Sequence, residues 1–226
     1  MNVLITGANR GLGLGFVQHY LAKGWQVWAC YRSECEALTN LNTEALHLVQ
    51  WDVSQDQVPS EALPDTIDLL INNAGVYGST TGGQSLDLIA PDDMLEVFNV
   101  NCVGPLRVVK HLKDRVIAAQ GIIANVSSKM GSSADNSSGG AYAYRAAKAA
   151  LVIVSKSMAV DLQSDGVRVV TLHPGWVQTD MTDHSGLIDV ETSVKGMMQV
   201  IADVGDSKKH YEAGQFIAFD GQVVPY

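Results

Sequence analysis

The chain has 226 residues, 46% of them hydrophobic, and a formal net charge of -9 at pH 7. That length and composition suit one globular domain over residues 1–226. Acidic and basic residues are interspersed without a run of Lys or Arg, so the sequence indicates no nucleic-acid partner and no membrane surface. Three cysteines without a CxxC pair and a start unlike a signal peptide predict a cytoplasmic, reducing location.

Seven short apolar runs rich in β-branched residues predict buried strands, at residues 3–6, 26–30, 46–50, 67–71, 121–126, 167–172 and 215–219. Longer segments with helical spacing lie between most of them, at 11–23, 91–116, 142–162 and 190–204. Strands that alternate with helices predict βαβ units. We therefore expect an α/β fold, a Rossmann-type doubly wound parallel sheet of about seven strands with helices on both faces. Its ligands should bind at the carboxyl edge of the sheet.

The first predicted strand runs directly into a glycine-rich turn, TGANRGLG, which precedes a helical pattern. Gly7, Gly11 and Gly13 let the backbone turn sharply and approach a pyrophosphate, which the free N–H groups at the start of the helix attract. The spacing GxxxGxG departs from GxGxxG, and an ordinary tight turn between strand and helix is the alternative explanation.

Two further motifs follow the third and fourth predicted strands. Asp52-Val53 comes after the third, and Asn72-Asn73-Ala74-Gly75 comes after the fourth. Asp52 can accept a hydrogen bond from an adenine amino group, and residues 72–75 can form a backbone wall beside a cofactor. Asp and Asn-Gly are also common turn residues at the ends of strands, so each motif alone stays ambiguous.

Tyr144 and Lys148 begin the predicted helix at 142–162, and their spacing of four residues puts them on one helical face. A tyrosine hydroxyl, with a pKa of about 10, is a poor acid-base group at neutral pH. A nearby ammonium and a cationic nicotinamide both stabilise the phenolate, so Tyr144 can exchange a proton with a carbonyl oxygen. Tyr142 is a second phenol nearby, but no Lys follows it at the same spacing.

Polar residues at two other positions complete this constellation. Ser127 and Ser128 follow the fifth predicted strand, where a hydroxyl can hold the substrate oxygen, and we select Ser128. The alternative is that the pair merely begins a Ser-rich loop. Asn101 can place an amide inside the helix at 91–116, behind Lys148, or it can mark a simple kink before Gly104.

The sixth predicted strand ends in HPGWVQTD, residues 173–180. Pro174-Gly175 fixes a turn, and Thr179 can bond a nicotinamide carboxamide, although Pro-Gly alone is only a turn signal. The six histidines show neither HExxH nor close metal-ligand spacing, so we expect no metal site. The stretches 78–84 and 131–140 lack apolar periodicity and are expected to be loops, the second of them beside a substrate pocket.

Together and in this order, TGANRGLG, Asp52-Val53, NNAG, Asn101, the serine pair, YRAAK and PGWVQT resemble the short-chain dehydrogenase/reductase family over nearly the whole chain. Within that family, a group of carbonyl reductases similar to Sniffer and C-factor is resembled by four stretches: ANRGLGLG, SSADNSSGGAYAYRAAK, HPGWVQTDM and the closing residues 214–226. The resemblance implies a catalytic tetrad of Asn101, Ser128, Tyr144 and Lys148. Ser128 lies farther before the tyrosine than is usual in the family, because residues 131–140 are inserted between them.

The resemblance also implies a cofactor site at the carboxyl edge of the sheet. The expected cofactor contacts are Gly7, Asn9, Arg10, Gly11, Leu12, Gly13, Arg32, Asp52, Val53, Asn73, Ala74, Gly75, Tyr144, Lys148, Pro174, Gly175, Val177 and Thr179.

The end of the second predicted strand indicates which cofactor is used. NAD-preferring sheets usually offer an acid there to the ribose hydroxyls. This chain has Tyr31-Arg32 instead, and Arg10 lies in the glycine turn, so two guanidinium groups can converge on a 2′-phosphate. We therefore predict NADP(H). Two ordinary surface arginines are the alternative.

We thus expect an NADPH-dependent oxidoreductase that transfers a hydride between NADP(H) and a small carbonyl or alcohol substrate. The alternative is an NADP(H)-binding regulatory or signalling protein of the C-factor kind with little turnover. Family relatives often pair through the helices that contain Asn101 and Tyr144, so a homo-oligomer, a dimer or tetramer, is expected.

Overall fold

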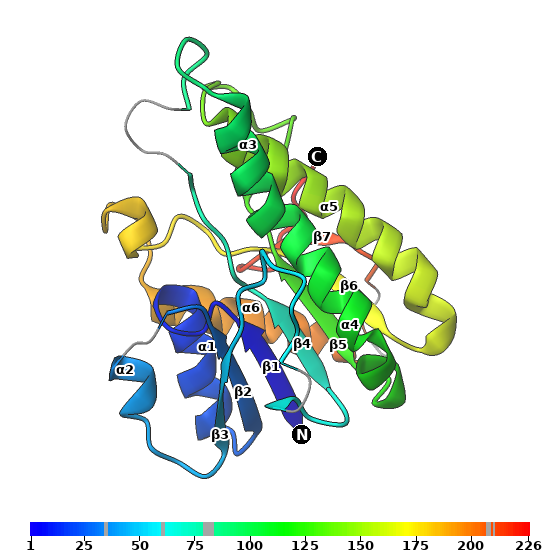
Figure 1. The fold of residues 1–226 in the computed structure, drawn as a ribbon. Helices are drawn as coiled ribbons and strands as arrows, with labels where there is room; N and C mark the ends of the chain where they lie inside the picture. Colours follow the sequence, from blue (N-terminus) through cyan, green and yellow to red (C-terminus); the bar gives the residue numbers. More distant parts are fainter. Residues whose placement is uncertain (34–35, 60–61, 79–83, 207–208, 210) are drawn as a thin grey trace.

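The computed structural model describes the chain apart from residues 34–35, 60–61, 79–83, 207–208 and 210. Seven strands form one parallel sheet in the order β3-β2-β1-β4-β5-β6-β7, with helices packed around it (Figure 1). The strands are β1 (Asn2–Thr6), β2 (Gln26–Tyr31), β3 (Leu46–Gln50), β4 (Leu69–Asn72), β5 (Ile122–Val126), β6 (Arg168–His173) and β7 (Phe216–Ala218). The predicted doubly wound α/β fold is confirmed.

The direction in which the chain adds strands reverses beside β1. From β1 the chain moves outward through β2 to β3, then returns to place β4 on the other edge of β1. Leu4 of β1 consequently lies between Trp28 of β2 and Leu70 of β4. Because the connections leave β1 and β4 in opposite directions, a crevice opens at their carboxyl ends.

Helices cover both faces of the sheet. They are α1 (Gly11–Ala22), α2 (Glu36–Thr39), α3 (Pro91–Phe98), α4 (Gly104–Ala118), α5 (Tyr142–Leu162) and α6 (Val190–Gly205). Residues of α1 and α6 share one apolar cluster with the sheet, and residues of α4 and α5 share the other. No helix in the described part of the chain combines the length and apolarity of a membrane span.

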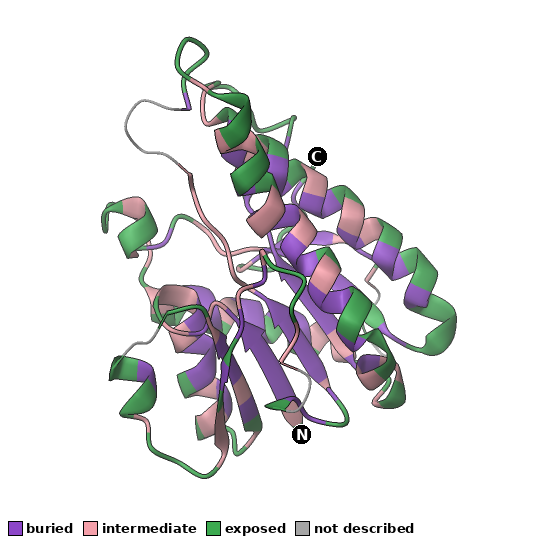
Figure 2. Ribbon diagram, viewed as in Figure 1, coloured by how far each residue is buried: buried purple, intermediate pink, exposed green. Residues whose placement is uncertain are grey.

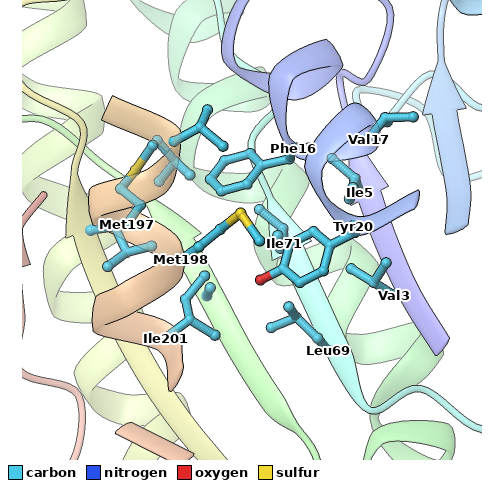
Figure 3. Close-up of a cluster of buried hydrophobic side chains, with 14 of the residues drawn as sticks. Val3, Ile5, Phe16, Val17, Tyr20, Leu69, Ile71, Met197, Met198 and Ile201 are labelled. Atoms are coloured by element: carbon cyan, nitrogen blue, oxygen red, sulfur yellow. The ribbon is translucent and has the colours of Figure 1, made fainter. Parts of the chain in front are cut away.

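The arrangement of the core explains why the strands are continuous apolar runs in the sequence. In β1, Val3 and Ile5 face the cluster of α1 and α6, where Phe16 and Met198 pack against them (Figure 3). Leu4, between them, belongs to the opposite cluster. Alternate residues are therefore buried on opposite faces, and the central strands are buried along their length (Figure 2).

The single helix expected over residues 91–116 is interrupted. A π-helical turn, Asn99–Val103, separates α3 from α4. Pro105 has no N–H to donate to the carbonyl four residues earlier, at Asn101, so the regular α-helical ladder fails there. The turn brings Asn101 to the sheet edge, fully buried. The π-helical turn thus accounts both for the buried amide of Asn101 and for the break in the helix that was the alternative explanation.

Candidate active site

A cleft of about 1100 Å³ opens at the carboxyl ends of the central strands. Its walls combine the turn after β1, the ends of β3, β4 and β5, the start of α5 and the segment after β6. Nearly all of the predicted site residues line this cleft; Gly13 and Asn101 do not. The volume exceeds that of a typical drug-sized pocket and suits a dinucleotide beside a small substrate.

The glycine turn lies against the segment that follows β4. A Cβ added at Gly7, where φ is +63°, would lie 2.7 Å from the Cα of Ala74. A Cβ at Gly13 would lie 2.1 Å from the carbonyl oxygen of Gly7. Neither position has room for a side chain, so both glycines are needed for backbone packing. The turn residues that line the cleft are Gly7, Asn9, Arg10, Gly11 and Leu12.

Side-chain hydrogen bonds fix this turn to the end of β4. The Asn73 carboxamide donates to the carbonyl oxygens of Thr6 at 3.0 Å and Gly7 at 3.1 Å. The buried Thr6 hydroxyl accepts from the backbone N–H groups of Asn73 and Ala74. Asn73 therefore holds the turn in shape together with Thr6, which is not among the predicted site residues.

Charged residues also line the cleft on the side of the glycine turn. Partial burial alone would raise the pKa of Asp52, but hydrogen bonds from Ser54 and the charge of Arg32 hold that pKa below its ordinary value. Arg32 and Arg10 both line the cleft. The Arg10 guanidinium donates to the carboxylate of Asp180 at 3.3 Å, which joins the two walls across the opening.

Lys148 extends from the first turns of α5 to the end of β5. Its ammonium donates to the carbonyl oxygen of Val126 at 2.8 Å and lies 5.8 Å from the ring centroid of Tyr144. Burial lowers the pKa of Lys148 to about 8. The ammonium is therefore charged at neutral pH but is held in a site that makes its charge costly.

Tyr144 is buried beside Tyr77, whose ring centroid lies 5.1 Å away. Burial raises the pKa of Tyr144 to about 12, against the effect of a hydrogen bond with the Ser128 side chain. The phenol is therefore protonated at neutral pH and is in reach of a second hydroxyl. Tyr142, the other phenol of this helix, is partly exposed and does not line the cleft.

The two serines after β5 point in different directions. The Ser127 hydroxyl donates to the backbone carbonyl of Lys148 at 2.9 Å, so it fastens α5 to the sheet. Ser128 lines the cleft, and its oxygen accepts from the backbone N–H of Met130 at 3.2 Å. The hydroxyl proton of Ser128 thus stays available for another acceptor.

Asn101 lies behind the cleft. Its Oδ1 accepts from the backbone N–H of Val76, and its Nδ2 donates to the carbonyl of the same residue, both at 2.8 Å. A Cβ added at Gly75 would lie 3.2 Å from Asn101 Oδ1 and 3.5 Å from Lys148 Nζ. Asn101 therefore holds the chain after β4 beside the lysine.

The segment after β6 forms the last wall. Gly175 has a φ of +86°, and a Cβ there would lie 2.7 Å from the Ile188 side chain. Thr179 approaches the glycine turn, because a Cβ at Gly11 would lie 3.5 Å from its methyl group. The predicted residues of this segment that line the cleft are Pro174, Gly175, Val177 and Thr179.

Several residues that line the cleft were not predicted. They are Trp51, Tyr77, Met130, Arg145, His173 and Trp176 among others. The histidine is the last residue of β6 and Trp51 directly follows β3, so strand-end reasoning could have flagged both positions. The others belong to loops or to a helix face, and no spacing rule selects them. Asp135 and Ser138 place the 131–140 loop at the cleft, whereas most of the 78–84 loop falls outside the described residues.

Comparisons with known proteins agree with this geometry. The family model described as short chain dehydrogenase matches residues 1–187. The C-signal protein of Myxococcus xanthus is 42% identical over 163 residues, which are 71% of this chain and 93% of that protein. The structure of carbonyl reductase Sniffer of D. melanogaster superposes with a TM-score of 0.89 at 29% identity, covering 100% of this chain and 99% of that chain.

A second solved structure, the NADPH-bound carbonyl reductase from chicken fatty liver, has a TM-score of 0.86 and 30% identity. It covers 100% of this chain and 98% of its own. The order of the motifs, the sheet topology and these matches lead to one conclusion: the chain belongs to the short-chain dehydrogenase/reductase family.

Proposed function

We propose that this chain, as one domain over residues 1–226, is an NADPH-dependent carbonyl reductase that interconverts a small carbonyl compound and its alcohol. The observation that carries the proposal is the Tyr144 phenol, which lies in the cleft with the Ser128 hydroxyl beside it and the Lys148 ammonium one helical turn away. Such a group of donors suits a reaction in which an oxygen gains or loses a proton.

The cleft residues fit NADP(H). The turn at Gly7 and the start of α1 offer backbone N–H groups without an acidic residue in the first helical turn, which suits a pyrophosphate. Arg10 and Arg32 would hold the 2′-phosphate, Asp52 the adenine, and Thr179 the carboxamide. The NADPH-bound relative at 30% identity supports this choice. When bound, the cofactor supplies the hydride for the carbonyl carbon.

The chain's own residues handle the proton. Ser128 donates a hydrogen bond to the substrate oxygen, and Tyr144 transfers its phenol proton to that oxygen as the alcohol forms. A pKa of about 12 keeps Tyr144 protonated for this direction. In the reverse direction the phenolate is the base, and the Lys148 ammonium stabilises it. Asn101 keeps the neighbouring backbone in place through Val76.

A second candidate function is cofactor-dependent signalling with little turnover. The C-signal relative, at 42% identity, favours it. A sensor has no need of a proton donor in the cleft, so the Tyr144 arrangement favours the enzyme. Steady-state NADPH oxidation over a panel of aldehydes, ketones and quinones separates the two. We expect turnover with some members of the panel; tight NADPH binding without turnover on any would support the sensor.

We also propose a homo-oligomer in the cytoplasm. Exposed apolar side chains lie on α3 and α4, at Leu95 and Leu106, and on α5, at Ile153 and Val160. In Figure 1, α3 continues into α4, and the two run beside α5 on one flank of the molecule. Light scattering after gel filtration tests the association, and Ile153→Glu should shift the mass toward that of the monomer.

A further inference from the structure

Gln84 is a buried polar residue that no motif singled out, and only 8% of its surface is exposed. Its Nε2 donates to the carbonyl oxygen of Tyr77 at 2.5 Å, and its Oε1 accepts from the backbone N–H of Tyr144 at 3.1 Å. A carbonyl only accepts and an N–H only donates, so the two partners fix the orientation of the carboxamide. Gln84 thus joins the chain after β4 to the start of α5.

The start of α5 explains why an outside acceptor is needed. The helix begins at Tyr142 after Ala141, which has a left-handed backbone, with φ of 49°, and no side-chain cap. The N–H of Tyr144, the third helical residue, is one that an N-cap side chain normally satisfies. Alanine has no acceptor. The Gln84 oxygen, from a residue 60 positions earlier, takes that place.

The Nε2 atom of Gln84 binds a segment whose position is also fixed by other contacts. Asn101 bonds both backbone groups of Val76, the residue before Tyr77. Gly78, the residue after it, has a φ of +96°, and a Cβ there would lie 2.7 Å from the Val97 side chain. This segment is therefore a firm support, against which Gln84 sets the position of α5.

We propose that Gln84 is a positioning residue for Tyr144, which sets the phenol relative to Ser128 and to the facing ring of Tyr77. The inference rests on the proposed role of Tyr144 as proton donor. Gln84 does not line the cleft, so it acts through the two tyrosines and touches neither cofactor nor substrate. Its loss should consequently lower kcat while NADPH binding persists.

Two substitutions separate positioning from simple stability. Gln84→Met keeps the size of the side chain but has no amide donor and no oxygen acceptor. Gln84→Glu keeps both hydrogen bonds while its carboxyl is protonated, because the O–H donates to Tyr77 and the second oxygen accepts. Once ionised, it places negative charge against the Tyr77 carbonyl. Burial raises the pKa of such a carboxyl, so the change falls within a workable pH range.

Turnover is measured from pH 5 to 9, with the carbonyl that the wild type reduces fastest. We expect Gln84→Met to lower kcat about tenfold to a hundredfold at every pH, with the Kd for NADPH within about twofold. Gln84→Glu should approach wild-type kcat at the acid end and lose it as the pH rises. Gln199→Met, an exposed position on α6, is the matched control and should behave as wild type.

A Gln84→Met protein with wild-type kcat would overturn the proposal. If that variant does not fold, Gln84→Glu provides the test. A loss of kcat in Gln84→Glu that is the same at every pH would contradict a role through both hydrogen bonds. A readout without turnover is the ¹⁹F resonance of Tyr144 in fluorotyrosine-labelled protein, assigned with Tyr144→Phe. It should shift in Gln84→Met at every pH and in Gln84→Glu at the alkaline end of the range, and it should not shift in Gln199→Met.

The two readouts also separate this proposal from the proposed function. If the wild type reduces no carbonyl, the proposed function fails, and the resonance still shows whether Gln84 positions the phenol. An unmoved resonance overturns the positioning role whether or not turnover is seen.

Discussion

The two halves of the cleft are formed by different kinds of structural element. The nucleotide half, which comprises residues 6–13, Arg32, Asp52-Val53 and 73–75, consists of strand ends and a glycine turn that the side chains of Thr6 and Asn73 hydrogen-bond together. The substrate half, which comprises Tyr77, residues 129–140, Trp176 and residues 180–184, consists of loops and two short 3₁₀ turns. Trp176 and Met181 there are 52% and 43% exposed.

From this difference we expect the nucleotide half to be the more constrained in sequence and the substrate half to set specificity. A pyrophosphate can be held by backbone N–H groups, so the nucleotide half needs glycines at fixed places and tolerates little change. A substrate pocket on loops can change its side chains without disturbing the sheet. Tyr144, Ser128 and Lys148 lie where the two halves meet.

The largest expected effect is at that junction. Tyr144→Phe removes only the phenol proton donor, so we expect kcat to fall by roughly two to four decades while the Kd for NADPH stays within a few-fold. Steady-state kinetics and fluorescence titration measure the two quantities. Tyr142→Phe, which changes a phenol outside the cleft, should be mild. Retained turnover in Tyr144→Phe would remove the residue from the mechanism.

A second effect concerns His173, at the end of β6. Burial, together with the charge of Lys129, lowers the pKa of His173 from 6.5 to about 4. The unfolded chain therefore binds more protons than the folded chain between those values, and the free energy of unfolding falls by about 3 kcal/mol as the pH drops from above 6.5 to below 4. Urea unfolding at several pH values measures this loss.

His173→Asn sharpens that measurement. The Nδ1 of His173 accepts from the backbone N–H of Lys129, and an asparagine oxygen can replace it without titrating. The variant should lose less stability at acid pH than the wild type does. His184→Asn, at an exposed position, serves as the control. Equal acid sensitivity of His173→Asn and the wild type would contradict the assignment.

The third effect tests the nucleotide half. Arg32→Ala should raise the Kd for NADPH by roughly tenfold to a hundredfold, because a charge-assisted hydrogen bond to the 2′-phosphate contributes about 1.5–3 kcal/mol. The Kd for NADH, which lacks that phosphate, should hardly change. Arg168→Ala is the matched control, because Arg168 lies at the end of β6 away from the cleft. Equal losses for both cofactors would refute the role of the arginine in cofactor choice.

The smallest effect is expected in the substrate half. Arg145 holds the 131–140 loop through the Met130 carbonyl and the Ser138 hydroxyl. Removing residues 134–137 takes away Asp135, which lines the cleft. We expect KM and carbonyl preference to change by a few-fold, with the Kd for NADPH unchanged. Identical constants for several unrelated carbonyls would make the segment a mere surface loop.

The sequence predicted the sheet and the tight glycine turn after β1 for the same physical reason. Strands buried on both faces must be apolar throughout, and a tight turn against Ala74 must be glycine, so both leave local patterns. The π-helical turn at 99–103 leaves no such pattern beyond Asn101 and Pro105. Gln84 leaves none at all, because its two partners lie on separate segments and only the folded chain brings them together.

Hydride transfer itself is the most direct test of the proposed function. NADPH deuterated at the transferring C4 position is incubated with the carbonyl panel, and the alcohol products are analysed by mass spectrometry. We expect one deuterium on the carbinol carbon with wild-type protein and a product yield reduced by at least about a hundredfold with Tyr144→Phe. The absence of a deuterated alcohol from every carbonyl, with NADPH demonstrably bound, would contradict the proposed function.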